Sequence, residues 1–421
     1  YGFKSRYYID ASWRTDGSSR FHPSDRWGHF WSVGASWRIS EEQFMENTRQ
    51  WLDNLTLKVS YGVQGNDNLG TYYAWQGLYD YTWPNATDAG AFVDKLENRK
   101  VTWEKNGNLN AGIEATMFGG RLGVSVEYYN RKTRDMLLNS PLPISTGFTG
   151  FNDNVGSLRN QGLEVSLRGT ILDKRDFRWD ATLMGSFNRN KVLSLTGGQD
   201  VITSGIRVIE VGRPIYTFYL PKTAGVDPAT GKQLYYAYWT QTVNDEGALV
   251  NTRCDEYITD NVAMATLSKY YHESREPKLF GSIGSTFTIL KNIDVSFLTT
   301  YSIGGWVYDG LYNGSMYVQY AGNNWHKNAK RRWQKPGDKT DVPMLEVGGS
   351  YATTSNSLID ASYFAIKNIT VGYTLPKRWL KKIDIESLRI YATLDNIAMF
   401  NHMDGMDPQY NFTGSVAYSY T

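Results

Sequence analysis

One pattern limits what this chain can fold into more than any other: apolar and polar side chains alternate with a period of two over about ten residues at a time. In residues 121–133, "RLGVSVEYYNRKT", the apolar side chains are those of Leu122, Val124, Val126 and Tyr128. Successive side chains of a β-strand point to opposite faces, so the pattern predicts a strand with one apolar face. A soluble sandwich and a membrane barrel share this pattern and differ in whether the apolar face meets a core or lipid.

The same alternation recurs along much of the chain, and no segment with a helical period of comparable strength competes with it. The strands it predicts exceed the five or six residues that are usual in soluble sheets, and they approach the roughly nine to eleven that cross a bilayer. We therefore predict an all-β fold of about a dozen antiparallel strands. Examples cover residues 55–63, 163–171, 177–188, 293–303, 369–375 and 388–394.

The connections between the predicted strands alternate in length. An up-and-down membrane barrel has short periplasmic turns and long extracellular loops, which gives this alternation. Soluble sandwiches cross over in Greek keys and vary their loops without it. The segment 205–275 has the least certain strand pattern. The short connections are predicted at 118–120, 172–176, 290–292 and 376–386, and the long ones at about 64–101, 140–157, 191–204 and 305–358.

Composition excludes several classes of protein. No stretch approaches the ~18–20 apolar residues of a transmembrane helix. The net charge of +2 gives no reason to expect a nucleic-acid partner, and the short basic run at 327–335 fits a solvated loop. Cys254 is the single cysteine, which excludes an intrachain disulfide. Aromatic residues make up 14% of the chain, and rings at predicted strand ends, such as Trp37 and Trp103, fit interfacial girdles or the edges of any sheet.

No catalytic signature is present. The sequence lacks the G-x-S-x-G, H-E-x-x-H and P-loop motifs, and its five histidines lack metal-ligand spacing. We therefore expect no enzyme and no cofactor. The oxygen-rich segment 401–409, "NHMDGMDPQ", is a candidate for a structural calcium in an outer loop, although it lacks the twelve-residue calcium-loop pattern. The segment 224–236, "AGVDPATGKQLYY", predicts a reverse turn.

Several stretches, in order and with plausible spacing, resemble the successive barrel strands of SusC/RagA-type TonB-dependent transporters. Three examples are "RWGHFWSVGASWRISEEQFM" (26–45), "NVGSLRNQGLEVSLRG" (154–169) and "SYFAIKNITVGYTLPK" (362–377). The tail at 388–409 resembles the penultimate strand and outer loop of this family. Residues 11–21, 55–66 and 101–138 complete the resemblance.

The resemblance implies an outer-membrane importer with about 22 strands around a plugged lumen. Residues 1–421 would be the C-terminal part of that barrel, with the plug domain, the TonB-contacting segment and the N-terminal barrel strands absent from this chain. An open set of strands leaves unpaired edges in lipid, so the rest of the barrel must come from elsewhere in the polypeptide or from another chain. In this orientation Leu122, Val124, Val126 and Tyr128 face lipid, whereas Ser125 and Glu127 face the lumen.

The resemblance also implies partners: a SusD-like surface lipoprotein over the extracellular opening, TonB acting through the missing N-terminal region, and outer-membrane lipid. Long outer loops such as 305–335 are the expected contacts of the lipoprotein. The expected cargo is a nutrient too large for a porin, with an oligosaccharide favoured over a peptide. Two alternatives stay open, namely a passive outer-membrane porin and a soluble secreted β-sheet protein that binds glycans.

Substrate contacts are expected from loop aromatics, because a ring stacks on the apolar face of a sugar while neighbouring polar groups bind its hydroxyls. "YDYTWPN" (79–85) and "NNWHKN" (323–328) have this composition. The alternative is that these rings pack a loop against its neighbour or against the lipoprotein. The candidate substrate-binding residues are Trp83, Asn85, Trp325 and His326.

Overall fold

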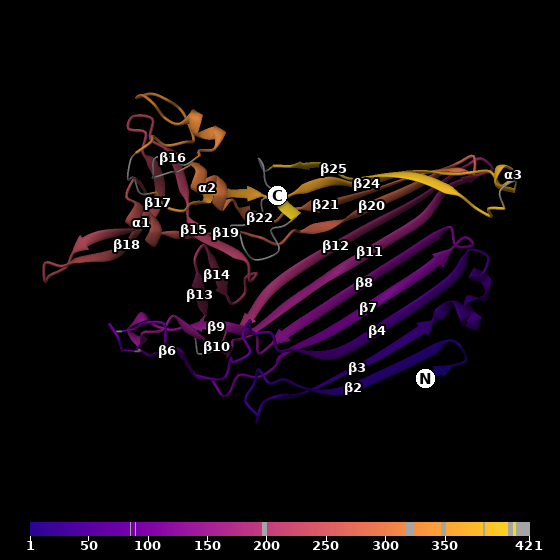
Figure 1. Cartoon of the computed structure of the whole chain (residues 1–421), viewed down its shortest axis with the longest axis horizontal. Coiled ribbons are helices and arrows are strands. Elements are labelled where there is room, and N and C mark those ends of the chain that lie inside the picture. Colours follow the sequence, from indigo (N-terminus) through magenta and orange to yellow (C-terminus); the bar gives the residue numbers. More distant parts are fainter. Residues whose placement is uncertain are drawn as a thin grey trace.

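The computed structural model describes residues 1–409, except for 85, 89, 196–199, 317–323, 347–350, 382–383 and 403–406, and it does not place the side chains of Pro141 and Ser204. Among the described residues, twelve strands form one antiparallel sheet in which spatial order follows chain order. Figure 1 shows this sheet as a single curved layer. The prediction of an all-β, up-and-down fold with about a dozen strands is confirmed. The strands are β1 (Gly2–Phe3), β2 (Tyr7–Gly17), β3 (Trp27–Arg38), β4 (Leu52–Asn66), β7 (Glu104–Met117), β8 (Leu122–Arg134), β11 (Ser157–Lys174), β12 (Phe177–Ser194), β20 (Leu279–Ile289), β21 (Ile293–Ile303), β24 (Tyr363–Thr374) and β25 (Arg389–Asn401).

Short turns join the strands at one end of the sheet, on the right in Figure 1. The turn between β7 and β8 is tight because Gly119 and Gly120 have φ angles of 66° and 80°, a region that glycine occupies without steric cost. The Gly120 N–H donates to Asp53 Oδ2 at 2.9 Å, which ties this turn to β4. All four predicted short connections lie at this end. Two connections at this end contain short helices: β3–β4 contains η1 (Ile39–Glu41) and η2 (Gln43–Thr48), and β24–β25 contains α3 (Lys377–Leu380).

Long segments at the opposite end carry small sheets of their own. One prediction needs correction here: 191–204 is not a separate loop, because β12 continues to Ser194 and the next barrel strand begins only at Leu279. The strands in between belong to two small sheets rather than to the barrel wall, and most are too short to show a clear alternation. They are β13 (Val201–Ser204), β14 (Arg207–Glu210), β15 (Thr217–Pro221), β16 (Thr223–Val226), β17 (Gln233–Val243), β18 (Leu249–Thr259) and β19 (Lys269–Ser274), with α1 (Val262–Leu267).

The other three long segments are smaller. Between β4 and β7 lies a hairpin of β5 (Leu78–Asp80) and β6 (Phe92–Lys95), and a second hairpin lies between β8 and β11. The β21–β24 segment returns through short helices. The remaining elements are β9 (Leu137–Pro141), η3 (Ile144–Thr146), β10 (Gly150–Asn154), β22 (Trp306–Tyr308), α2 (Gly310–Met316), η4 (Lys327–Arg331), η5 (Ser355–Ser357) and β23 (Leu358–Asp360).

One face of the large sheet is apolar and uncovered. Across neighbouring strands Val124 pairs with Leu167, Leu167 with Leu183, and Leu183 with Ile283. Leu167, Leu183 and Ile283 are 36, 43 and 38% exposed, so no protein core covers this row. A soluble protein rarely exposes a continuous apolar surface of this kind, whereas the outside of a membrane barrel always does. The predicted division of β8 into an apolar and a polar face is confirmed. Its apolar face carries Leu122, Val124, Val126 and Tyr128.

The opposite face of the sheet is polar and lines the lumen. Glu127 on β8 pairs with Glu164 on β11, and Glu164 pairs with Ser186 on β12. Residues directly opposite each other in an antiparallel pair share a face, so these three side chains belong to one polar row. Ser125, two residues before Glu127, lies on the same face.

Some rings expected in an interfacial girdle have another role. Trp103 is buried among Phe21 and Phe30, with ring centroids 5.4 and 5.3 Å away, and its Nε1–H donates to the Arg26 carbonyl at 2.9 Å. It closes a small core under the long loops because the loop after β2 folds over it. Trp51, at the end with the short turns, is exposed and lies beside Phe118.

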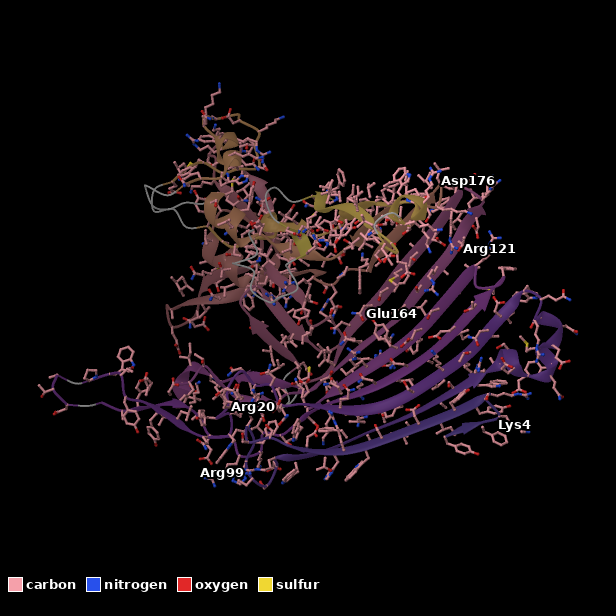
Figure 2. All side chains as sticks on the ribbon, turned by 45° about the vertical axis from the view of Figure 1, so that its right-hand side comes forward. Lys4, Arg20, Arg99, Arg121, Glu164 and Asp176 are labelled. Atoms are coloured by element: carbon pink, nitrogen blue, oxygen red, sulfur yellow. The ribbon has the colours of Figure 1, made fainter. Side chains whose placement is uncertain are left out.

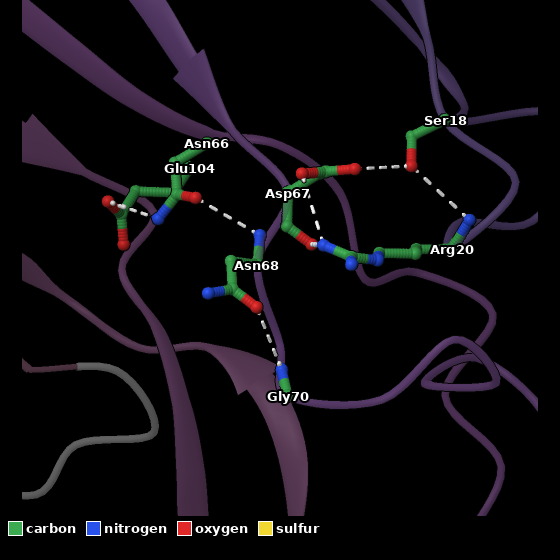
Figure 3. A network of polar contacts seen from close by, with 7 residues as sticks. All are labelled: Ser18, Arg20, Asn66, Asp67, Asn68, Gly70 and Glu104. Carbon is green, nitrogen blue, oxygen red and sulfur yellow. Dashed lines mark hydrogen bonds and ion pairs between the residues drawn. The ribbon is translucent and has the colours of Figure 1, made fainter.

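A polar network ties the long loops together next to this core (Figure 3). Ser18 Oγ donates to Asp67 Oδ2 at 2.7 Å, and Arg20 Nη1 donates to the Asp67 carbonyl at 3.2 Å. Asn66 Nδ2 donates to Glu104 Oε1 at 3.2 Å. These bonds link the β2–β3 and β4–β7 loops to the start of β7, so the rim of the lumen has a fixed shape on this side.

The sheet ends in two open edges. β2 and β25 are exposed along almost their whole length, including positions that would be covered inside a closed barrel. Unpaired backbone groups cannot face hydrocarbon, so both edges require further strands. Among the described residues, no helix has the length and hydropathy of a membrane span.

Candidate functional site

A cavity of about 710 Å³ lies on the polar face, where the large sheet meets the segment between β19 and β20. Figure 2 places Glu164, one of its lining residues, midway between the turns that carry Arg121 and Asp176 and the loops that carry Arg20 and Arg99. The cavity is therefore on the inner wall, away from both rims. Its volume falls in the range of small-ligand sites.

A second cavity of about 790 Å³ adjoins the first on the side of β2 to β4. Asn110 and Arg131 line both cavities, so the two form one groove across the polar face. Asp10, Ser12 and Gln64 add acceptors and donors on the side of the second cavity. The groove thus offers a continuous hydrogen-bonding surface between the rim with the long loops and the middle of the sheet.

Cross-strand hydrogen bonds hold much of the wall in place. The Tyr129 hydroxyl donates to Asn188 Oδ1 at 2.8 Å, and Asn190 Nδ2 donates to Asn160 Oδ1 at 2.7 Å. Gly162, between Tyr129 and Asn188, leaves room for the tyrosine: a Cβ there would lie 2.5 Å from the Tyr129 hydroxyl oxygen. These contacts present a rigid wall to a ligand.

Three charged side chains of the first cavity lack such partners, whereas Arg131 Nε donates to Asn108 Oδ1 at 2.9 Å. Glu127 and Glu164 form no ion pair with any described residue. Arg275, just before β20, is only 7% exposed, and its Nε has no acceptor among the described residues. Burial raises the pKa of the neighbouring Glu276 to about 7, although its carboxylate accepts a hydrogen bond from the Asn190 N–H. Unsatisfied buried charge at a concave surface is typical of a binding site.

Comparison with known proteins identifies the family of the chain. The family model described as "TonB dependent receptor-like, beta-barrel" matches residues 1–397. The chain belongs to this family of TonB-dependent receptor β-barrels. Its relatives are receptors and transporters rather than enzymes.

Individual relatives of this receptor barrel are of the SusC/RagA type. A TonB-dependent receptor of Formosa agariphila is 28% identical over 458 residues, which cover 99% of this chain and 43% of the relative. TonB-dependent receptor SusC of Bacteroides thetaiotaomicron is 28% identical over 424 residues, covering 97% of this chain and 40% of SusC. A structure of the RagAB peptide transporter matches with a TM-score of 0.81 at 30% identity, covering 97% of this chain and 44% of that one. The chain therefore spans less than half the length of the relatives it matches.

The predicted substrate-binding residues lie on separate loops of the receptor barrel. Trp83, in the β5–β6 hairpin, is 67% exposed, and its ring contacts Phe92 edge to face. Asn85 lies outside the described residues. Trp325 is exposed beside η4, in the β21–β24 segment. No described contact joins the two loops, and none of these side chains lines the groove.

His326 has a structural role in its own loop. Its ring packs edge to face on Tyr312 with centroids 4.8 Å apart, and its Nδ1 accepts a hydrogen bond from the Asn328 N–H at 3.2 Å. The side chain therefore caps the start of η4. This arrangement matches the alternative that these residues pack a loop, and leaves their contact with a substrate a prediction.

Sequence reasoning found one wall of the groove and missed the other. The alternation placed Glu127 in the lumen, but nothing singled out Arg275 and Glu276 within the poorly patterned segment before β20. The available signal was weak: two adjacent opposite charges a few residues before the apolar and polar alternation of β20 begins.

The described part of the chain contains no group of three or more His, Cys, Asp or Glu side chains placed to hold a metal ion. Much of the segment considered for calcium, 401–409, lies outside the described residues because 403–406 are not placed.

Proposed function

We propose that this protein is part of an outer-membrane importer that takes up a nutrient too large for a porin, either an oligosaccharide or a peptide, with energy delivered through TonB. The observation that carries the proposal is the pairing of faces in one sheet: an exposed apolar face for lipid and, behind it, a polar face with a continuous groove. Family membership supports the same proposal.

The mechanism is gated binding without covalent chemistry. The ligand enters from the long-loop end, exchanges its water for hydrogen bonds from groove residues such as Asn110 and Tyr129, and moves on when the plug is displaced by TonB. The barrel wall supplies positioning and hydrogen bonds and needs no bound cofactor. The segment 401–409 stays a candidate for a structural calcium.

The partners follow from the surfaces that one chain of this length leaves open. A SusD-like surface lipoprotein would cover the long loops, including 305–335. The RagAB structures, which match this chain, are of a peptide transporter described in "open-open" and "closed-closed" states. Further strands of the same barrel would pair with the edge formed by β1 and β2 and with the edge formed by β25.

Uptake by whole cells tests this function. Deletion of the gene should abolish uptake of the cargo, and loss of TonB should abolish it to the same degree. Uptake that persists without TonB would indicate a passive porin instead. Recovery of the full-length protein in buffer without detergent would indicate a soluble glycan-binding protein.

We also propose that Trp83, Asn85, Trp325 and His326 make a first contact with the cargo on the outer loops. The exposure of Trp83 and Trp325 supports this role, since a ring must be accessible to stack on a ligand. Replacing both tryptophans with alanine should weaken capture of the cargo by whole cells at least tenfold. Unchanged capture would assign both rings to loop packing.

A further inference from the structure

The first cavity contains two carboxylates that oppose each other. Glu127 and Glu164 are direct cross-strand neighbours on the polar face, and both line the cavity. Like charges at directly opposite positions repel each other. No described lysine or arginine forms an ion pair with either one, in contrast to Glu114 on the same face, which binds Lys58 at 2.6 Å. Arg131 also lines the cavity but binds Asn108, so the pair presents negative charge to the cavity that no ion pair with a described residue compensates.

The other wall of the cavity carries an uncompensated positive charge. The Arg275 side chain is buried and makes no hydrogen bond or ion pair with a described residue. Burial, together with the nearby Arg207, lowers the pKa of Arg275, so its surroundings increase the cost of the charge rather than offset it. Its chain neighbour Glu276 is held partly protonated by burial and does not neutralise it. A buried charge without a partner persists where a ligand supplies one.

We propose that this cavity is a subsite for a short peptide with both termini free. The proposal rests on the proposed import function and names its cargo. The peptide ammonium group lies between Glu127 and Glu164, and the peptide carboxylate accepts hydrogen bonds from Arg275. Both interactions are charge-assisted hydrogen bonds, which are about twice as strong as neutral ones.

Other ligands satisfy only part of the site. A neutral oligosaccharide brings hydroxyl groups but no charge to Glu127, Glu164 and Arg275. An acidic oligosaccharide brings negative charge to the arginines of the cavity but none that compensates the two carboxylates. A calcium ion requires six to eight oxygen ligands, whereas the carboxylate pair supplies at most four. A zwitterionic ligand compensates both walls at once, and the cavity of about 710 Å³ is large enough for a small ligand.

Calorimetric titration of the full-length transporter, purified with its lipoprotein partner in detergent, tests the subsite. The probes are tetraalanine with free termini, its N-acetylated form, its C-terminal amide, and maltotetraose. Each cap should weaken binding at least about tenfold, because each removes one charged hydrogen-bonding group. Maltotetraose should bind more weakly than free tetraalanine.

Variants of the transporter test which wall of the cavity binds each terminus of the peptide. In the double variant Glu127→Gln/Glu164→Gln, N-acetylation should make no further difference, while amidation still weakens binding. In Arg275→Met, amidation should make no further difference, while N-acetylation still weakens binding. This variant should fold because it removes a buried charge that has no partner. Glu114→Gln and Lys58→Met are matched controls, since they remove the same charges from the same face outside the cavity, and both should keep the full discrimination.

Three results would overturn the subsite: no binding of free tetraalanine, equal binding of free and capped peptides, or binding of calcium chloride alone that is lost in Glu127→Gln/Glu164→Gln. None of these results affects the uptake measurement. There, uptake that persists without TonB would reject the import function. The two proposals can therefore fail separately.

Discussion

At the scale of single residues, the two faces of β8 should differ in what surrounds them, with lipid on one side and water on the other. Val124 belongs to the exposed apolar row and Ser125 to the lumen face. An arginine at position 124 must bring its charge toward the middle of the bilayer, whereas at position 125 it meets water. Val124→Arg should therefore lower the free energy of unfolding by about 2–4 kcal/mol, and Ser125→Arg by far less. Urea unfolding of the full-length protein in lipid vesicles measures both, and equal costs would mean that the apolar face does not meet lipid.

Glu276 gives stability a defined pH dependence. Its pKa rises from 4.5 to about 7 because burial disfavours the charged carboxylate. The folded state therefore binds the proton more tightly than the unfolded state, and this contribution to stability is complete below about pH 4.5 and is lost as the pH rises to about 7. Glu276→Gln should flatten the profile of unfolding temperature against pH in this window. Exposed Glu273→Gln should leave the profile unchanged.

At the scale of elements, the predicted reverse turn at 224–236 also docks a distant loop. Gly231 has a φ of 75°, and its N–H donates to the Asp227 carbonyl at 2.8 Å, which confirms the turn. The ring of Trp333 lies over Gly231, 2.5 Å from where a Cβ would be, and its Nε1–H donates to the Pro228 carbonyl at 2.9 Å. The turn thus anchors the segment that follows η4.

Gly231→Ala should release this segment. The added methyl group meets Trp333. The backbone of the alanine must also keep a left-handed conformation, which alone costs roughly 1 kcal/mol. Limited proteolysis should then cut around residues 327–346 at least several-fold faster. Gly247→Ala is the control, because Gly247 has a similar φ of 78° and no neighbour within 4 Å. Equal acceleration in both variants would show that backbone strain, and not the tryptophan contact, controls the loop.

At the scale of the whole molecule, the two ends of the sheet differ in how much chain they carry. The short-turn end carries few residues beyond the strands, whereas the long segments at the other end build small sheets and cores of their own. A photo-cross-linker at exposed Lys330 should capture the surface lipoprotein, and one at exposed Arg121 should not. Capture of periplasmic proteins alone from position 330 would reverse the orientation.

Most of the barrel wall could be predicted from the sequence, because the alternation within each strand shows which of its side chains share a face. The alternation at 121–133 fixes which side chains of β8 share a face, and a turn such as 118–120 fixes where the chain reverses. The segment 195–278 could not be predicted in this way. Its strands are mostly short and pair within small sheets, so burial depends on neighbours that the local pattern does not show.

By itself, the sequence determined most strands of the barrel wall, their two faces and the positions of the short turns, since all three depend on residues close together in the chain. Only the tertiary structure decided that Glu127, Glu164 and Arg275 line one cavity and that Trp83 and Trp325 lie apart. The physical reason is register. Residues that are distant in sequence come together when strands pair and when a long segment folds back onto the sheet. The periodicity of the sequence does not show these contacts.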